Sequence, residues 1–157
     1  MTSRNYLNDS AKNKITQGLQ QVLADSFVLY FKTHSFHWNV EGPHFKGLHD
    51  MFEEQYTDLW NFTDECAERI RALSSYGPNS FREMLDYASL QEAGQTPDAM
   101  GMVQKLAQDN RAIVDVMYPV LRTAEEAGDE ATVDMLIGRI HIHEKSAWML
   151  ESFAKEG

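Results

Sequence analysis

The sequence predicts an all-α protein, a four-helix bundle with a short extra helix between the second and third long helices. Four long stretches carry apolar side chains at the three- and four-residue spacing of an amphipathic helix. Gly42-Pro43, Gly77-Pro78 and Thr96-Pro97 separate these stretches. No stretch shows the sustained alternation of a strand, and no internal repeat interrupts the pattern. We therefore expect one helical domain over residues 1–157, with residues 1–9 as a short N-terminal tail.

The first long helix is predicted from about Ser10 to Trp38, and the second from about Phe45 to Leu73. The core stripe of the first helix consists of Ile15, Leu19, Val22, Ser26, Tyr30 and Thr33, widened by Leu23 and Phe27. The stripe of the second consists of Leu48, Phe52, Gln55, Leu59, Phe62, Cys66, Ile70 and Leu73. Gln55 is the one polar member of that second line.

Capping signals set the ends of the remaining helices. Ser80 and Glu83 form a plausible capping box at the start of the short helix. Thr96-Pro97-Asp98 predicts the start of the next long helix, which ends near Gly128 and is expected to bend at Pro119. The last helix carries a stripe of Leu136, Ile140, His143, Ala147, Leu150 and Ala154.

Composition narrows the class of protein. The 14 Lys and Arg against 24 Asp and Glu leave a formal net charge of −10, which suits a protein that attracts cations rather than one committed to phosphate backbones. No apolar run reaches the length of a membrane span, and the first residues lack the apolar stretch of a signal peptide. The single cysteine, Cys66, cannot form an internal disulfide. We expect a cytoplasmic protein.

Four of the six histidines lie close together, and acids follow them on the second helix. With Leu48 set at zero on a helical wheel, the flank between about 100° and 200° holds His49, Glu53, Trp60, Asp64 and Glu68. A solvated face explains the carboxylates by themselves. An indole among them is easier to explain if another surface covers that flank.

One chain alone cannot close a metal site on this flank. His49 and Asp64 are fifteen positions apart, or roughly 22 Å along one helix. Positions 49 and 68, like 53 and 64, are symmetric about the point between Asp58 and Leu59. Two copies of the helix packed antiparallel about a two-fold axis there would form two identical sites, each split between subunits.

The residue types indicate the metal. Imidazole and carboxylate without thiolate suit iron, manganese or zinc. Helical bundles usually hold two iron ions through Glu-x-x-His on two helices of one chain. Here that string occurs only as Glu41-Gly42-Pro43-His44, in a predicted loop. This absence favours the site shared between subunits.

The pattern resembles the Dps family, the DNA-binding proteins from starved cells, also called mini-ferritins. The resemblance rests on three segments: residues 34–43 (HSFHWNVEGP), Leu48-His49, and residues 64–69 (DECAER). It implies a ferritin-like bundle whose iron ligands are His37, His49 and Glu53 from one subunit and Asp64 and Glu68 from the other. The family usually has Asp where this chain has Glu53.

The resemblance also implies an assembly and a reaction. Members form a hollow dodecamer built from two-fold dimers, which oxidises ferrous iron, preferably with hydrogen peroxide, and stores the ferric mineral. Trp38 and Trp60 are candidate electron donors, although both could simply pack at an interface. Candidate acids of the pore through which iron passes are Glu125, Glu130 and Asp134. Carboxylates also favour helix N-termini, which explains Glu130 nearly as well.

Two alternatives remain at this point. The first is a shell that protects DNA by coating it, with little catalysis. Few bases support it, since Arg4 alone precedes Asp9, so we expect direct DNA binding to be weak at physiological salt. The second is a bundle whose acidic flank is only a dimer surface. Histidines outside the cluster have simpler explanations, with His143 in the core and His141 at the surface or facing a cavity.

Overall fold

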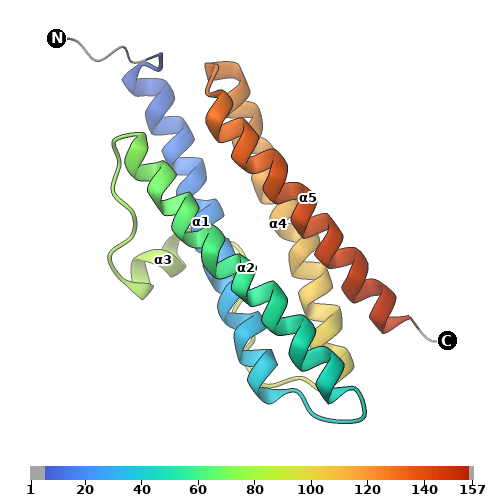
Figure 1. Ribbon diagram of the computed structural model, residues 1–157. Helices are drawn as coiled ribbons and strands as arrows, with labels where there is room; N and C mark the ends of the chain where they lie inside the picture. The colour runs from blue at the N-terminus through green and yellow to red at the C-terminus, as the bar shows by residue number, and fades with distance from the viewer. Residues whose placement is uncertain (1–5, 156–157) are drawn as a thin grey trace.

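The computed structural model describes residues 6–155 and contains five α-helices. They are α1 (Asp9–Asn39), α2 (Phe45–Ala72), α3 (Phe81–Tyr87), α4 (Ala99–Ala127) and α5 (Glu130–Ala154). Figure 1 shows α1 beside α2 and α4 beside α5, with α1 also packed on α4 and the short α3 against α1. The prediction of an all-α four-helix bundle with an extra short helix is confirmed.

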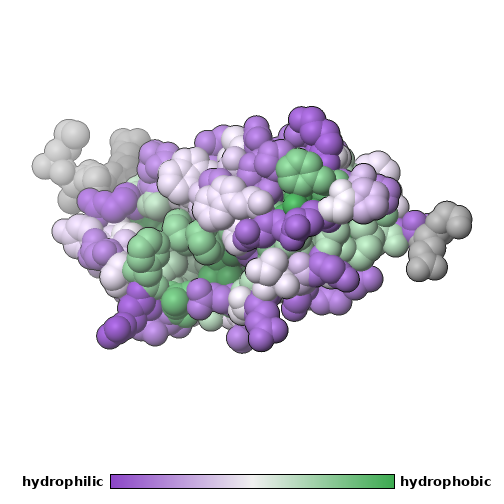
Figure 2. Space-filling view, turned by 90° about the horizontal axis from the view of Figure 1, so that it is seen from below, coloured by the Kyte–Doolittle hydropathy of each residue, from purple (hydrophilic) through white to green (hydrophobic). Residues whose placement is uncertain are grey.

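The core lies between the four long helices and uses the predicted stripes. Leu19 of α1, Phe52 of α2, Leu106 of α4 and Leu136 of α5 are fully buried. Tyr30 and Gln55 are only partly buried, at the edge of the core. Apolar side chains also reach the surface in patches rimmed by hydrophilic ones, as Figure 2 shows for one face. Among residues 6–155, no helix is both long and apolar enough to cross a membrane.

The helix ends follow capping chemistry, with two corrections. The Ser80 hydroxyl accepts from the Glu83 amide as predicted, but the Glu83 carboxylate accepts from Asn79 instead of Ser80. Helix α4 begins after Asp98, whose carboxylate accepts from the Gly101 amide, so Asp98 and not Thr96 is the cap. A carboxylate fits that place because it also meets the positive end of the helix dipole.

The turn between α4 and α5 requires a glycine. Gly128 ends α4 in the left-handed region with φ of 77°, where other residues are strained. Asp129 follows it and caps α5. Pro119 lies inside α4, and the bend we expect there stays a prediction.

Two buried polar residues of α1 hold the segment after α3. The Asp25 carboxylate accepts from the Ser89 hydroxyl and from the amides of Ser89 and Leu90 at 2.6–2.8 Å. Lys32 donates to the Asp109 carboxylate at 2.7 Å and to the Gln91 carbonyl. Asp25 is fully buried and Lys32 is 6% exposed. The segment is therefore held by bonds that satisfy otherwise costly buried charges.

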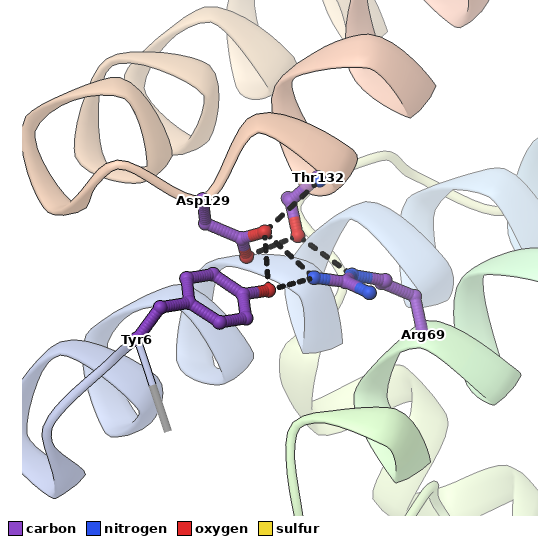
Figure 3. Close-up of polar contacts among 4 residues, drawn as sticks. All are labelled: Tyr6, Arg69, Asp129 and Thr132. Atoms are coloured by element: carbon purple, nitrogen blue, oxygen red, sulfur yellow. Dashed lines mark hydrogen bonds and ion pairs between the residues drawn. The ribbon is translucent and has the colours of Figure 1, made fainter. Parts of the chain in front are cut away.

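A second polar network joins the chain start, α2 and α5 (Figure 3). Arg69 of α2 donates to the carboxylate of Asp129 at 2.6 Å and to the hydroxyls of Tyr6 and Thr132. The Asp129 carboxylate, which is fully buried, also accepts from Tyr6 and Thr132. Residues 1–5 of the predicted tail lie outside the described residues, whereas Tyr6 takes part in this network and Leu7 is buried.

A third network crosses the core at His143, which is 1% exposed as predicted for a core histidine. Its Nδ1 bonds the side-chain amide oxygen (Oδ1) of Asn110 at 2.8 Å, and its Nε2 accepts from Arg139 at 2.9 Å. Arg139 in turn pairs with Asp58 of α2 at 2.6 Å. Burial, and then the Arg139 charge, hold the pKa of His143 well below its usual value. Protonation would place two cations against each other in the core.

This low pKa predicts a pH dependence of stability. The unfolded chain binds a proton at position 143 below about pH 6.5, whereas the folded chain does not. The contribution of His143 to the free energy of unfolding should therefore be constant above about pH 6.5. Below about pH 6.5 it should decrease by up to about 1.4 kcal/mol for each pH unit. Denaturant titrations of wild type and a His143→Gln variant between pH 7.5 and 5 test this. The wild type should lose stability more steeply, and parallel curves would contradict the assignment.

Candidate metal centre

The end of α1 and the start of α2 bring two imidazoles together. The rings of His37 and His49 stack with centroids 3.8 Å apart and 15° between their planes. Each Nδ1 bonds the other residue's backbone carbonyl, at 2.7 Å from His37 and 2.8 Å from His49. The short loop between the two helices allows this reciprocal pairing. We call His37 and His49 the imidazole pair.

These bonds determine which ring nitrogens are available. A carbonyl oxygen can only accept, so each Nδ1 carries the hydrogen and each lone pair lies on Nε2. Metal-bound histidines are commonly oriented in this way, by a carbonyl on the second nitrogen. The His37 Nε2 lies 3.9 Å from Glu53 Oε1. The free nitrogen of His37 therefore lies near a carboxylate that follows His49 by one turn of α2.

The three side chains form a partial ligand set. One ligand atom each from His37, His49 and Glu53 lies within 4.8 Å of the others, and residues 6–155 contain no second group of three such side chains. His37 is buried, His49 is half-buried, and the Glu53 side chain is 58% exposed. The buried His37 thus anchors the ligand set in the protein, and the exposed Glu53 leaves it open toward the surface. Nitrogen and oxygen donors of this kind suit iron, manganese or zinc.

Asp64 and Glu68 do not join this group within one chain. Both are exposed, further along α2. A hydrogen bond with Asp64, and then repulsion from its charge, raises the pKa of Glu68. A proton relieves the repulsion between two adjacent carboxylates, and a bound cation would relieve it as well. The structure therefore divides the five predicted ligands into a group of three and a pair.

Aromatic side chains extend from the imidazole pair along α1 and α2. The Tyr56 ring lies 5.1 Å from that of His37 and stacks on that of His34 at 3.7 Å. The Tyr30 hydroxyl is 2.8 Å from His34 Nδ1. Burial, then the neighbouring Tyr56, raises the pKa of Tyr30, while burial, then His37, lowers the pKa of His34. Both groups therefore favour their uncharged forms.

Both predicted electron donors, Trp38 and Trp60, border this chain of rings. Trp60 is 54% exposed and packs on Tyr30 at 5.1 Å, and Trp38 is 57% exposed and lies 4.6 Å from His34. Trp60 and Tyr30 also line a groove of about 790 Å³ between α1, α2 and the α3 region. Sequence reasoning missed Tyr30 and Tyr56 as neighbours of the site. The four-residue spacing of Tyr30 and His34 was the available signal.

The predicted pore acids lie far along the chain from the imidazole pair. Glu125 is on the last turn of α4, where Arg122 pairs with it at 2.8 Å. Glu130 and Asp134 are exposed on the first turns of α5. Their common pore would require neighbouring copies of the chain, so that role stays a prediction.

Comparisons with known proteins show the family to which the chain belongs. The family described as "Ferritin-like domain" matches residues 16–157. A DNA protection during starvation protein of Brevibacillus brevis is 39% identical over 135 residues, or 86% of this chain and 91% of that protein. A low temperature-induced protein of Nostoc is 41% identical and covers 94% of this chain and 83% of its own length.

Solved structures show the same fold. The Dps protein from Bacillus brevis superposes with a TM-score of 0.91 at 36% identity, over 95% of this chain and 100% of that one. The Dps protein from Vibrio cholerae O1 does so with a TM-score of 0.90 at 33% identity, over 98% and 100%. The fold and the site thus define a ferritin-like protein. Within that class, the chain belongs to the Dps family.

Proposed function

We propose that this protein is a ferroxidase that oxidises Fe(II) to Fe(III), with hydrogen peroxide as the oxidant, and stores the ferric product in a hollow dodecamer. The observation that carries the proposal is the group of His37, His49 and Glu53, whose ligand atoms lie within 4.8 Å of one another. The Vibrio cholerae relative is described as a member of a broad superfamily of ferritin-like diiron-carboxylate proteins. That description supports iron as the metal here.

In this proposal the site is completed by a second copy of the chain. Three ligand atoms leave coordination positions of an iron ion unfilled, and the open side of the group faces the surface. Asp64 and Glu68 supply carboxylates on the same helix, at positions that a two-fold axis between Asp58 and Leu59 would bring opposite Glu53 and His49. Two dyad-related copies of α2 would then form two sites, each with ligands from both subunits.

Iron is the substrate, and the chain's own residues determine how it reacts. The imidazole Nε2 atoms and the carboxylates hold Fe(II), and the negative charge favours Fe(III) over Fe(II). Two Fe(II) ions each give one electron to one hydrogen peroxide, and two protons complete two water molecules. Because both electrons arrive together, no hydroxyl radical is released. Such a shell protects DNA by removing the reagents of radical chemistry, without needing to bind DNA.

A matched pair of variants tests the activity. Anaerobic Fe(II) is mixed with hydrogen peroxide, and Fe(III) formation is followed by absorbance. A His49→Ala/Asp64→Ala variant should oxidise iron at least about 100-fold more slowly than wild type, because it loses ligands from both halves of the site. A His44→Ala/Asp115→Ala control loses one exposed imidazole and one exposed carboxylate elsewhere. The control should match wild type, and equal rates in all three proteins would refute the proposal.

A further inference from the structure

The chain of rings beside the imidazole pair has a hydrogen-bonding arrangement that packing alone does not require. Tyr30 and His34 lie one turn apart on α1, with the hydroxyl 2.8 Å from Nδ1. We propose that Tyr30 is a built-in electron donor that reduces one-electron oxidants formed at the metal centre, with His34 receiving the phenolic proton. This inference rests on the proposed ferroxidase function.

Tyrosine oxidation needs a base at the phenol. Loss of an electron makes the phenolic proton strongly acidic, so the proton must leave with the electron. His34 Nδ1 is in hydrogen-bond contact with the hydroxyl, and both side chains are only partly exposed. The proton therefore moves within one hydrogen bond and stays beside the radical, ready to return when the tyrosine is reduced again.

Ring contacts connect this pair to the site where the oxidant arises. The His37 ring lies 5.1 Å from Tyr56, and Tyr56 stacks on His34 at 3.7 Å with 9° between the planes. Tyr30 and Tyr56 are 6.2 Å apart between centroids. Every step in this path is between rings in contact or nearly so. An electron can thus pass from Tyr30 to the metal centre without crossing an aliphatic gap.

The need for such a donor follows from partial occupancy. When a site holds a single Fe(II), that ion reduces hydrogen peroxide by one electron and yields Fe(III), hydroxide and a hydroxyl radical. The radical takes one electron from Tyr30 and becomes hydroxide, while the phenolic proton passes to His34. The products are a neutral tyrosyl radical and a protonated imidazole, so charge and atoms balance. The oxidising equivalent is then held as a radical on Tyr30 instead of leaving the site as a hydroxyl radical.

Tyr30 suits this role better than the two tryptophans nearby. Trp38 and Trp60 are each more than half exposed. Neither indole nitrogen has a hydrogen-bond partner among the side-chain bonds formed by residues 6–155. An oxidised indole would therefore have no hydrogen-bonded base within the chain to take its proton. Trp60 packs against Tyr30 at 5.1 Å and can shield it from solvent or pass an electron onward.

The test uses the assembled protein with one Fe(II) per site, mixed with hydrogen peroxide and frozen within a second. Electron paramagnetic resonance should detect a tyrosyl radical in wild type and its loss in Tyr30→Phe. Tyr118→Phe is the matched control, because Tyr118 lies far from Tyr30. Tyr118 is on α4, two residues from Val120, whose side chain lies close to Gly18 of α1. Gly18 is twelve residues from Tyr30 on α1, or roughly 18 Å away. Tyr118→Phe should keep the signal.

A second variant isolates the proton acceptor. His34→Gln retains a side chain able to accept a hydrogen bond but not a base able to take the proton, so the tyrosyl yield should drop although Tyr30 is present. An undiminished signal in Tyr30→Phe, or no tyrosyl signal in wild type that oxidises iron, would overturn the inference and leave the proposed function standing. A wild type that fails to oxidise iron would overturn both.

Discussion

Mixing two inactive variants is expected to restore iron oxidation. His49→Ala removes a ligand from the group of three, and Asp64→Ala removes one from the carboxylate pair. Each variant alone should lose nearly all peroxide-driven oxidation, because every site in its assembly lacks one ligand. Subunits of the two variants, unfolded together and reassembled in equal amounts, should recover about one quarter of the wild-type activity.

The recovery follows from the symmetry of a shared site. In a mixed dimer, one site combines both defects, and the other combines the intact His49 of one chain with the intact Asp64 of the other. Random mixing makes half of the dimers mixed, and half of their sites intact. If all ligands of a site came from one chain, every site would stay defective. The mixture should then be as inactive as its components.

The measurement is the rate of Fe(III) formation in wild type, each variant and the mixture, all taken through the same unfolding and reassembly. Wild type treated in this way corrects for incomplete recovery. A mixture of His37→Ala with His49→Ala serves as the control, because both ligands belong to the same half of the site. That mixture should regain nothing. Recovery there, or none in the first mixture, would contradict a site completed across the two-fold axis.

Loss of the Asp129 side chain is expected to cause the largest fall in stability. The carboxylate is fully buried and pairs with Arg69 at 2.6 Å, while it accepts further bonds from Tyr6 and Thr132. Asp129→Ala leaves the Arg69 guanidinium, 19% exposed, without its partner, and it also removes the cap of α5. The expected cost is about 3–5 kcal/mol.

Thermal unfolding at fixed protein concentration measures this cost, and a fall in Tm of roughly 10 °C corresponds to it. Arg122→Ala is the control, because Arg122 pairs with Glu125 on the surface, with both side chains substantially exposed. That change should cost less than about 1 kcal/mol. Similar Tm values for the two variants would show that the Asp129 network contributes little.

The sequence predicts the helices well because their signals are local. An apolar stripe such as the one from Leu48 to Ile70 repeats every three or four residues, and burial of one helix face requires that repeat. The sequence predicts the position of a capping residue only to within one or two residues. Thr96 and Asp98 both suit a cap, and only the path of the backbone selects Asp98.

For the candidate site, too, the sequence predicts one part of the arrangement and the structure supplies the other. Residue types and helical spacing predict His49, Glu53, Asp64 and Glu68 as metal ligands, and the family resemblance adds His37. The symmetry of positions 49 and 68 predicts a shared site. Spacing cannot show the reciprocal bonds from each Nδ1 to the opposite backbone carbonyl, which leave both Nε2 atoms free, with that of His37 3.9 Å from Glu53. Those bonds depend on the exact path of the loop between α1 and α2.

The sequence by itself thus determined the helical class, the core stripes and the kinds of ligand atoms, because each depends on residues a few positions apart. Only the tertiary structure decided which nitrogen of each imidazole is free, that Tyr56 lies between His37 and His34, and that Arg69 meets Asp129 sixty positions later. These contacts depend on how two helices pack, on their rotation and on their axial register. No local pattern encodes such quantities, since they result from the packing of the whole core.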